Sequence, residues 1–442
     1  MNMHSMSTLA FLGQVSSTRR FLEEKKAMME PTRLEQSTWL RFVFRAAHIL
    51  EGPGRCLLRL NAPHLLAAAR RRTHLHDFGD PALQEPLRRL VQSMEGEARL
   101  NFIGRVAARE ELTYMLMNRL KMERDRQQHP DIAAEQIRRP LFITGLPRTG
   151  STFLHGLLAQ DPANCAPLHW EIRDPSPPPE RATHETDPRI ERAARQIRWF
   201  FRLAPEFRKI HSVGSRLPEE CTVILSHTFL SSQFSSTWFV PSYQAWLEQQ
   251  DLRPAYQYHR QFLQHLQWHC PRQRWVLKAP LHLPGLGALL AIYPDANVIS
   301  LHRDPLEVVA SVASLHVTLR RTFSDAVDPL TVGLEVTRML AEDIRRGSEA
   351  RDAGCAPAEQ FVDVWYEQLL HKPLDIVRRI YRQFDLPLTA EAEAQMRQYL
   401  GRNPKDQYGP HVYSLAQFGL DHEVERERYR AYSQRWGAPA ET

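Results

Sequence analysis

The sequence lacks paired cysteines and long apolar runs. No two of its five cysteines form a C-x-x-C pair, which argues against a disulfide framework and against a zinc site. Widely spaced thiols suit a reducing compartment, and we expect a cytoplasmic protein. No run approaches about 18 apolar residues, so we expect no membrane span and leave peripheral membrane contact open. The N-terminal stretch MNMHSMSTLAFLGQVSSTRRFLEEKK is too polar for a signal peptide. The cysteines are Cys56, Cys165, Cys221, Cys270 and Cys355.

A strong excess of charge of one sign is also absent. The 442 residues include 57 Lys and Arg against 51 Asp and Glu, which gives a net charge of +6. This mild basicity suits an anionic small ligand, but nucleic-acid binding would need a clustered basic face, and we expect no nucleic-acid partner. Hydrophobic residues at 43% and charged residues at 24% are ordinary for a soluble globular protein, and the length allows two or three domains or one large α/β domain.

The first part of the chain has the spacing of helices. In TWLRFVFRAAHIL and ELTYMLMNRLKMERDRQ, apolar residues recur every three or four positions, and Pro and Gly separate such stretches. We therefore predict a helical N-terminal extension over residues 1–135. It either packs against the rest of the chain or forms one wall of a substrate pocket.

From residue 136 to residue 442, short apolar runs alternate with helical patterns. PLFITGLP, RWVLKAP, ANVISLHR and FVDVWYEQLL have the composition of strands, and a helical segment follows each of them. This alternation is typical of a parallel sheet with helices on its faces, so we predict an α/β domain over residues 136–442. Within it, residues 171–270 begin with a Pro-rich loop and continue with helical segments, which predicts a mostly helical insertion.

The segment FITGLPRTGSTFLHGLL, residues 142–158, begins like a nucleotide-binding loop. Its glycines have the spacing of the P-loop G-x-x-x-x-G-K-[ST], but Ser151 stands where the lysine is expected, and Arg148 is the loop's cation. A helix N-terminus binds anions through its unpaired N–H groups and its positive dipole end. Gly150 allows close approach of a phosphate, and Ser151 and Thr152 add hydroxyl donors. We predict a P-loop-like phosphate site; an ordinary strand–turn–helix is the alternative.

Cationic side chains follow three of the predicted strands. In open α/β sheets, ligands bind beyond the carboxyl ends of the strands. The loop with Arg148, Lys278 and Arg303 should therefore meet at one edge of the sheet. A nucleoside triphosphatase would need a loop lysine and an acidic strand end that holds Mg²⁺, and neither is visible. The pattern predicts a nucleotide bound without a metal.

Two motifs at this edge resemble the sulfotransferase family. GLPRTGSTFLHGLL resembles its 5′-phosphosulfate loop, and ISLHRDPLEVVASV resembles its 3′-phosphate motif, in which Ser311 follows Arg303 by eight positions. The WVLKAP and HRDP blocks are similar to the bacterial-type branch, and the resemblance covers about residues 138–420. It implies a P-loop-like α/β fold and transfer of a sulfuryl group from 3′-phosphoadenosine 5′-phosphosulfate (PAPS), without a metal, to a hydroxyl or amine. The acceptor would be a small or lipid-like molecule whose site the insertion shapes.

The resemblance also assigns residues to the 5′ end of the donor. Arg148, the N–H groups near Gly150 and three hydroxyls would hold the 5′-phosphate and the sulfuryl bridge. These hydroxyls belong to Thr149, Ser151 and Thr152. Phe153 matches a position where an aromatic ring can stack on adenine, and core packing is its alternative.

Further residues match the 3′ end of the donor. Arg303 and Ser311 would bind the 3′-phosphate, and Tyr366, in VWYEQLLHKP, would lie near adenine or in the core. Arg402 and Lys405 would form a basic segment that closes over the 3′-phosphate, or else are solvated cations.

Sulfuryl transfer needs a base and a cation near the transferred group. His282 in KAPLHLP resembles a catalytic histidine of the family's K-x-H-L-P stretch, although two extra residues separate it from Lys278. An ordinary histidine pKa of about 6.5 suits a base. Glu171 lies about twenty residues past the loop, where tyrosylprotein-type sulfotransferases place a glutamate base. We favour His282, with Glu171 as partner or replacement, and expect Lys278 and Arg148 to stabilise the sulfuryl group.

Other residues of the insertion have simpler interpretations. Glu219 and Glu220 are adjacent in RLPEECTVIL, so on a helix they would point in different directions, and we interpret them as a charge pair at a helix start. Five aromatic residues either line an apolar acceptor pocket or form a core. They are Trp170, Phe229, Phe234, Trp238 and Tyr243.

Two other functions stay open at the level of sequence. One is a kinase-like P-loop enzyme with a displaced lysine, and the other is a protein that binds PAPS, or its product adenosine 3′,5′-bisphosphate, without turnover. The sequence predicts no particular acceptor and no oligomeric state.

Overall fold

The computed structural model describes residues 59–204, 207, 213–402 and 414–437. The predicted helical segment TWLRFVFRAAHIL and Cys56 lie outside the described residues. Within them, the other four cysteines are free thiols, and no helix is both long and apolar enough to cross a bilayer.

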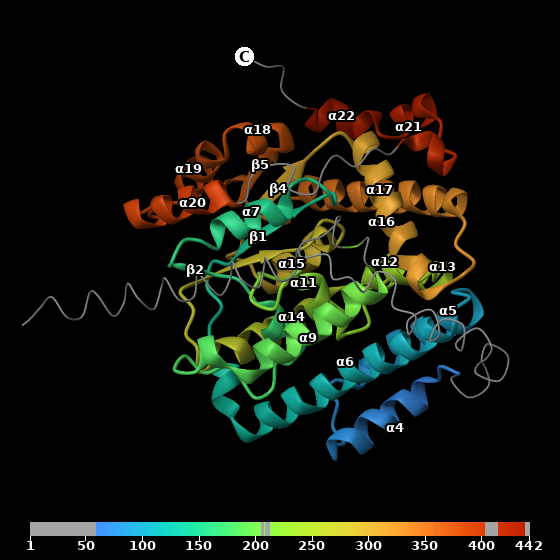
Figure 1. Ribbon diagram of the computed structural model, residues 1–442. Coiled ribbons are helices and arrows are strands. Elements are labelled where there is room, and N and C mark those ends of the chain that lie inside the picture. Colours follow the sequence, from blue (N-terminus) through green and yellow to red (C-terminus); the bar gives the residue numbers. More distant parts are fainter. Residues whose placement is uncertain (1–58, 205–206, 208–212, 403–413, 438–442) are drawn as a thin grey trace, which may run out of the picture. The chain divides into compact units, whose positions relative to one another are not determined.

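A parallel sheet of five strands lies at the centre of the described chain (Figure 1). The strands are β1 (Leu141–Gly145), β2 (Asn164–Cys165), β3 (Arg274–Lys278), β4 (Asn297–His302) and β5 (Phe361–Trp365). Their order is β2-β3-β1-β4-β5, and every pairing is parallel. The predicted α/β fold and four of its strands are confirmed. Strand β2 was not predicted, because its two residues are too few to form a pattern.

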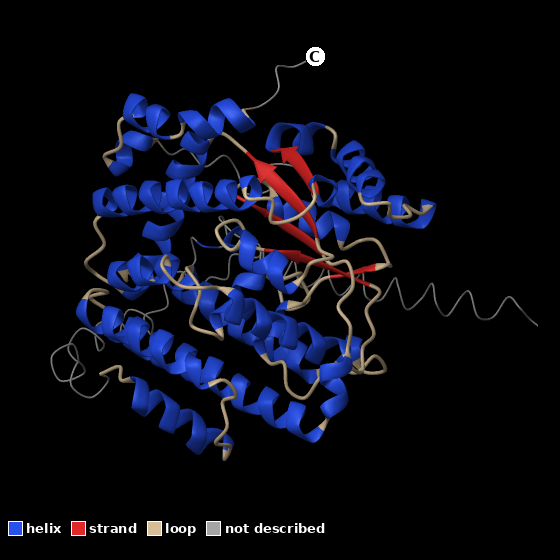
Figure 2. Ribbon diagram, turned by 180° about the vertical axis from the view of Figure 1, so that it is seen from behind, coloured by secondary structure: helices blue, strands red, loops and turns tan. Residues whose placement is uncertain are grey.

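Helices cover both faces of the sheet (Figure 2). Successive side chains of a strand point to opposite faces. On β1, Leu141 and Ile143 pack with one set of helices, whereas Phe142 packs with another. The first set is α7 (Ser151–Leu158), α19 (Pro373–Gln383) and α20 (Ala390–Arg402). The second includes α14 (Arg253–Gln267) and α15 (Leu286–Ile292). Because both faces are covered, every residue of β1, β3 and β4 is buried, which explains why these strands read as continuous apolar runs.

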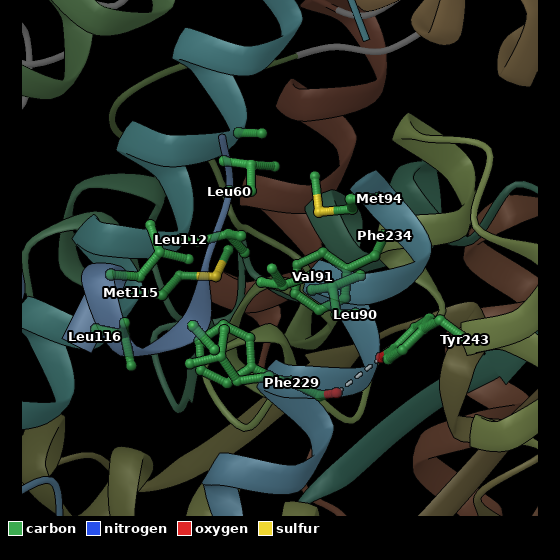
Figure 3. Packing of buried hydrophobic residues seen from close by; sticks show 14 of the residues in the cluster. Leu60, Leu90, Val91, Met94, Leu112, Met115, Leu116, Phe229, Phe234 and Tyr243 are labelled. Carbon is green, nitrogen blue, oxygen red and sulfur yellow. Dashed lines mark hydrogen bonds between the residues drawn. The ribbon is translucent and has the colours of Figure 1, made fainter. Parts of the chain in front are cut away.

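The helices that precede the sheet share a hydrophobic core with the insertion. They are α4 (Ala62–Thr73), α5 (Gln84–Gly96) and α6 (Phe102–Gln128). Figure 3 shows Met94 and Leu112 of these helices around Phe229 and Phe234 of the insertion. The Tyr243 hydroxyl donates to the Phe229 carbonyl oxygen over 2.8 Å. The insertion contains α8 (His169–Arg173), α9 (Pro188–Leu203), α11 (Cys221–Ser226), α12 (Gln233–Thr237), α13 (Pro241–Leu247) and α14. The domain boundary at residue 135 remains a prediction.

A further core joins the helices that follow β4 to those near the C-terminus. These helices are α16 (Pro305–Phe323), α17 (Pro329–Asp352) and α22 (Arg430–Trp436). Helix α21 (His422–Arg428) precedes α22, and α18 (Tyr366–His371) follows β5. The Asp304 carboxylate accepts a hydrogen bond from the Leu306 N–H over 2.8 Å, and Pro305 is the first residue of α16. Together they fix where α16 begins, directly after Arg303.

Candidate functional site

The loop between β1 and α7 is held in an unusual backbone conformation. Gly145 has a φ of 133° and Gly150 a φ of 80°, values that L-residues with side chains rarely adopt. A Cβ atom on Gly145 would lie 2.2 Å from the Leu301 carbonyl oxygen of β4. Arg148 also has a positive φ, 64°, which is uncommon for a residue other than glycine. Strain of this kind is often found where a loop is shaped for a ligand.

Arg148 and Arg303 meet beyond the ends of two neighbouring strands. The Nη1 atom of Arg303 donates to the backbone oxygen of Arg148 over 2.7 Å. The Nε atom of Arg148 donates to the Ser311 hydroxyl over 3.3 Å. The Arg303 guanidinium lies 4.2 Å from the centre of the Tyr366 ring. The structure thus brings together four residues that the sequence assigns to a donor site.

The sheet topology explains why a cleft is expected at this place. From β1 the chain passes through α7 toward β2 at one edge of the sheet, whereas from β4 it passes through α16 and α17 to β5 at the other edge. Neighbouring strands whose connections leave in opposite directions mark the switch point where ligands of such sheets bind.

Glu307 forms hydrogen bonds with the Arg303 guanidinium that an anionic ligand would have to replace. Its carboxylate accepts from Nε and Nη2 of Arg303 over 3.0 and 2.7 Å. The Glu307 side chain is 57% exposed and that of Arg303 20%. An anion that binds Arg303 would therefore displace a solvent-exposed carboxylate, which costs little.

The other loop residues differ in what they offer to a ligand. The Thr149 hydroxyl is buried and donates to the Leu146 carbonyl over 2.7 Å, so it stabilises the loop itself. Ser151 is buried and Thr152 is exposed. Phe153 is half-buried and packs against the core beneath α7. A Cβ atom on Gly150 would lie 3.2 Å from the Tyr366 ring, which places Tyr366 directly beside the loop.

Lys278 connects the loop to the insertion. Its side chain is 1% exposed, and its Nζ atom donates to the Thr152 hydroxyl over 3.1 Å and forms an ion pair with Glu220. Glu220 directly precedes α11, as predicted for a helix-start residue. The pairing of Glu220 with Lys278 was not predicted, because 58 residues separate them. The sequence around Glu220 indicates a helix start and gives no sign of a partner.

His282 lies in the core, and its Nε2 atom has no hydrogen-bond partner among the described residues. It is fully buried at the end of the short helix Pro280–His282, with its Nδ1 atom 2.9 Å from the Tyr256 hydroxyl. The Phe142 and His282 rings pack nearly perpendicular to each other, with ring centres 4.9 Å apart. Burial lowers the pKa of His282 well below its ordinary value. The side chain of His282 has no exposed atom, and its predicted role as the base stays a prediction.

Glu171 is also fully buried, within a cluster of ionic hydrogen bonds. Its carboxylate accepts from the Leu168 N–H over 2.8 Å, from His184 Nε2 over 2.8 Å and from Arg272 Nη2 over 2.6 Å. Burial alone would raise the pKa of Glu171, but Arg272 and His184 outweigh it and hold the pKa below its ordinary value. These bonds give Glu171 a structural role that accounts for its burial.

The predicted closing segment is described only in part. Arg402 is exposed as the last residue of α20, and Lys405 lies outside the described residues. Their proposed contact with a 3′-phosphate therefore remains a prediction.

A small pocket with a volume of about 30 Å³ lies between α11, α13, α14 and α17. Its wall is mainly apolar, with Asp343 and Arg346 of α17 at one side. The apolar wall includes Leu225, Leu230, Leu247, Leu252, Leu281 and Tyr256. By contrast, the five aromatic residues considered for a pocket are buried in hydrophobic cores. In the ranges that the structure describes, no group of three His, Cys, Asp or Glu side chains is arranged to hold a metal.

Comparison with known proteins identifies relatives for most of the chain. The profile described as the Sulfotransferase family matches residues 140–390. The omega-hydroxy-beta-dihydromenaquinone-9 sulfotransferases of Mycobacterium bovis and Mycobacterium tuberculosis are 26% identical over 272 residues, which are 59% of this chain and 66%, just under two thirds, of theirs.

Two solved structures are similar over nearly their whole length. The sulfotransferase STF1 from Mycobacterium tuberculosis has a TM-score of 0.74 and 33% identity, and the match covers 84% of this chain and 99% of that one. The sulfotransferase STF9 from Mycobacterium avium has a TM-score of 0.77 and 30% identity, with coverage of 86% and 98%.

Proposed function

Because the chain belongs to the sulfotransferase family, we propose that it transfers a sulfuryl group from PAPS to a hydroxyl or amine of a small or lipid-like acceptor. The contact between Arg148 and Arg303 carries this proposal. PAPS bears a 5′-phosphosulfate and a 3′-phosphate on one adenosine, so its site needs two cationic groups close to each other. The meeting of the two arginines at the switch point of the sheet fits this requirement.

Different residues around the two arginines would bind different parts of the donor. Arg148 and the N–H groups at the start of α7 would bind the 5′-phosphosulfate, since a helix N-terminus and a guanidinium both favour an anion. Arg303 and Ser311 would bind the 3′-phosphate. Tyr366, beside both Gly150 and Arg303, would lie against adenine.

We assign the base to Glu220 instead of His282 or Glu171. Glu220 is partly exposed, whereas the side chains of His282 and Glu171 are fully buried. Its carboxylate would take the proton of the acceptor hydroxyl as the acceptor oxygen bonds to sulfur and the bond from sulfur to the 5′-phosphate oxygen breaks. Lys278 lies between Glu220 and Thr152 of the loop, where its ammonium would stabilise negative charge on the sulfuryl and leaving oxygens.

The small pocket between α11 and α14 would mark where an apolar part of the acceptor enters, and its walls would have to move apart to admit more than a few atoms. Leu225 belongs to α11, which begins directly after Glu220, and Leu281 follows Lys278 by three residues. The cavity wall is therefore built from the same segments that carry the two groups proposed for catalysis. The curated relatives are named for a hydroxylated dihydromenaquinone, which supports an apolar alcohol as the acceptor.

Label transfer from PAPS tests this function. PAPS labelled in its sulfuryl group is incubated with the protein and a lipid extract, and the labelled products are separated. We expect one product class to gain the label, and Arg148→Ala to abolish the gain, while Arg345→Ala on the exposed surface of α17 leaves it unchanged. Binding of adenosine 3′,5′-bisphosphate without transfer would instead indicate a binding protein. Mg²⁺-dependent ATP turnover without PAPS turnover would indicate a kinase-like enzyme.

A further inference from the structure

The C-terminal helix α22 is attached to the end of β4, directly before Arg303. His302, the last residue of β4, is buried. Its Nδ1 atom lies 2.9 Å from the Tyr432 hydroxyl of α22, and its Nε2 atom lies 2.8 Å from the Asp363 carboxylate of β5. Its ring also stacks on Trp436, with ring centres 4.7 Å apart and planes 12° from parallel. The imidazole is therefore held at both nitrogens and on one face.

Asp363 is itself fixed in place. Arg351 donates to both of its carboxylate oxygens, over 2.7 and 3.1 Å. Burial alone would raise the pKa of Asp363, but the hydrogen bonds from His302 and Arg351 outweigh it and keep the pKa below its ordinary value. A carboxylate can only accept, so the Nε2 atom of His302 donates to it. The hydrogen bond to Asp363 fixes the orientation of the His302 ring, so that its Nδ1 atom faces the Tyr432 hydroxyl.

The same helix also contacts the backbone that carries the donor-site residues. The Tyr432 hydroxyl interacts with the backbone of Arg303. The indole N–H of Trp365 donates to the backbone oxygen of Trp436 over 2.9 Å, and Trp365 directly precedes Tyr366. Helix α22 thus contacts the ends of both β4 and β5, from which Arg303 and Tyr366 emerge.

We propose that Tyr432, acting through His302, is a positioning residue that sets Arg303 for the 3′-phosphate of the donor. This inference rests on the proposed function of the donor site. The Arg303 side chain spans the Arg148 carbonyl and the Tyr366 ring, so a small rotation at the end of β4 would move its guanidinium away from both. Charged groups act well only when their geometry is fixed in advance, and a misplacement of about 1 Å is costly.

Tyr432→Phe tests the proposal because it removes the hydroxyl and keeps the ring. We expect the Kd for adenosine 3′,5′-bisphosphate, measured by titration calorimetry, to rise about fivefold to twentyfold, as for a lost hydrogen bond at a buried site. His302→Gln, which removes the ring that transmits the contact, should raise the Kd at least as much. Both variants are checked by their melting temperatures.

Tyr429→Phe is the matched control. Tyr429 is buried in the same C-terminal segment, but its hydroxyl donates to the Thr337 carbonyl of α17 over 2.8 Å, away from the donor site. We expect this variant to lose stability and keep the wild-type Kd within about twofold. An unchanged Kd in Tyr432→Phe, or an equal rise in Tyr429→Phe, would overturn the positioning role. Failure of the wild-type protein to bind the bisphosphate would instead refute the proposed function.

Discussion

Arg303 donates a hydrogen bond to the backbone oxygen of Arg148, although 155 residues separate them in the sequence. Each arginine follows a central strand of the sheet, and the strands are neighbours. The loop that contains Arg148 and the strand end that carries Arg303 thereby form one cationic site. Such a site is what the proposed donor would need, because its ribose carries anionic groups at both the 3′ and the 5′ position.

Removal of the Glu307 carboxylate should strengthen donor binding. Glu307 holds Arg303 with two hydrogen bonds and places a negative charge where the 3′-phosphate is expected. An exposed pair of this kind contributes about 0.2–1 kcal/mol. We therefore predict that Glu307→Gln lowers the Kd for adenosine 3′,5′-bisphosphate about twofold to fivefold, as measured by calorimetry. Glu342→Gln, which breaks a surface pair with Arg345 of α17, is the control and should have no effect. Weaker binding in Glu307→Gln would contradict the placement of the phosphate.

Gly145 should tolerate no side chain. Its positive φ and the 2.2 Å approach of a Cβ atom to the Leu301 carbonyl mean that alanine must push β1 away from β4. The backbone strain alone costs about 1–3 kcal/mol. We predict that Gly145→Ala lowers the free energy of unfolding by at least this amount in urea titrations. Gly96→Ala, at the end of α5 with no atom near the new Cβ, should be neutral or slightly stabilising. Equal stability of the two variants would refute the close approach.

The buried cluster around Glu171 should make stability depend on pH. Burial lowers the pKa of His184, but its hydrogen bonds to Glu171 and Glu185 dominate and raise it to about 9. A raised pKa means that the protonated ring stabilises the fold. This contribution is complete below about pH 6.5 and is lost as the pH rises through about 9. Since one pKa unit corresponds to about 1.4 kcal/mol, the loss is roughly 3 kcal/mol.

The difference between wild type and His184→Gln measures this contribution. The difference in unfolding free energy, from urea titrations, should shrink between pH 6.5 and pH 9.5. His64→Gln, at an exposed position of α4, is the control and should show no such trend. A difference that grows with pH would contradict the cluster.

If Glu220 is the base, its substitution should lower the transfer rate, whereas substitution of His282 should mainly lower stability. Glu220→Gln should lower the transfer rate about 10²- to 10⁴-fold, because a general base contributes that much, and should leave the Kd for the bisphosphate within about twofold. His282→Gln should lower the melting temperature because His282 packs in the core, while the folded protein keeps most of its rate. Loss of transfer in His282→Gln together with an active Glu220→Gln would return the base to His282.

The sequence predicted those features that depend on local pattern. The strands β1, β3 and β4 are fully buried and β5 is mostly buried, so their short, largely apolar segments stand out in the sequence. Arg148, Arg303 and Ser311 converge because each lies at a fixed distance from such a strand. The pairing of Glu220 with Lys278 was not predictable, because it depends on how the insertion folds back on the sheet.

The burial of His282 was not predictable either, because it also depends on how distant segments pack. Its partners Tyr256 and Phe142 come from a helix of the insertion and from β1, so a pattern around residue 282 does not show that its ring points into the core. The motif correctly placed the residue at the junction between β3 and the next helix, but the side-chain direction follows from tertiary packing.

The affinity for adenosine 3′,5′-bisphosphate, measured by calorimetry in Arg148→Ala, Arg303→Ala and the surface variant Arg345→Ala, tests the central claim most directly. Hydrogen bonds to charged groups contribute about 1.5–3 kcal/mol, so each of the first two variants should bind about 10- to 150-fold more weakly, while Arg345→Ala binds like the wild type. Wild-type affinity in both Arg148→Ala and Arg303→Ala would contradict the account.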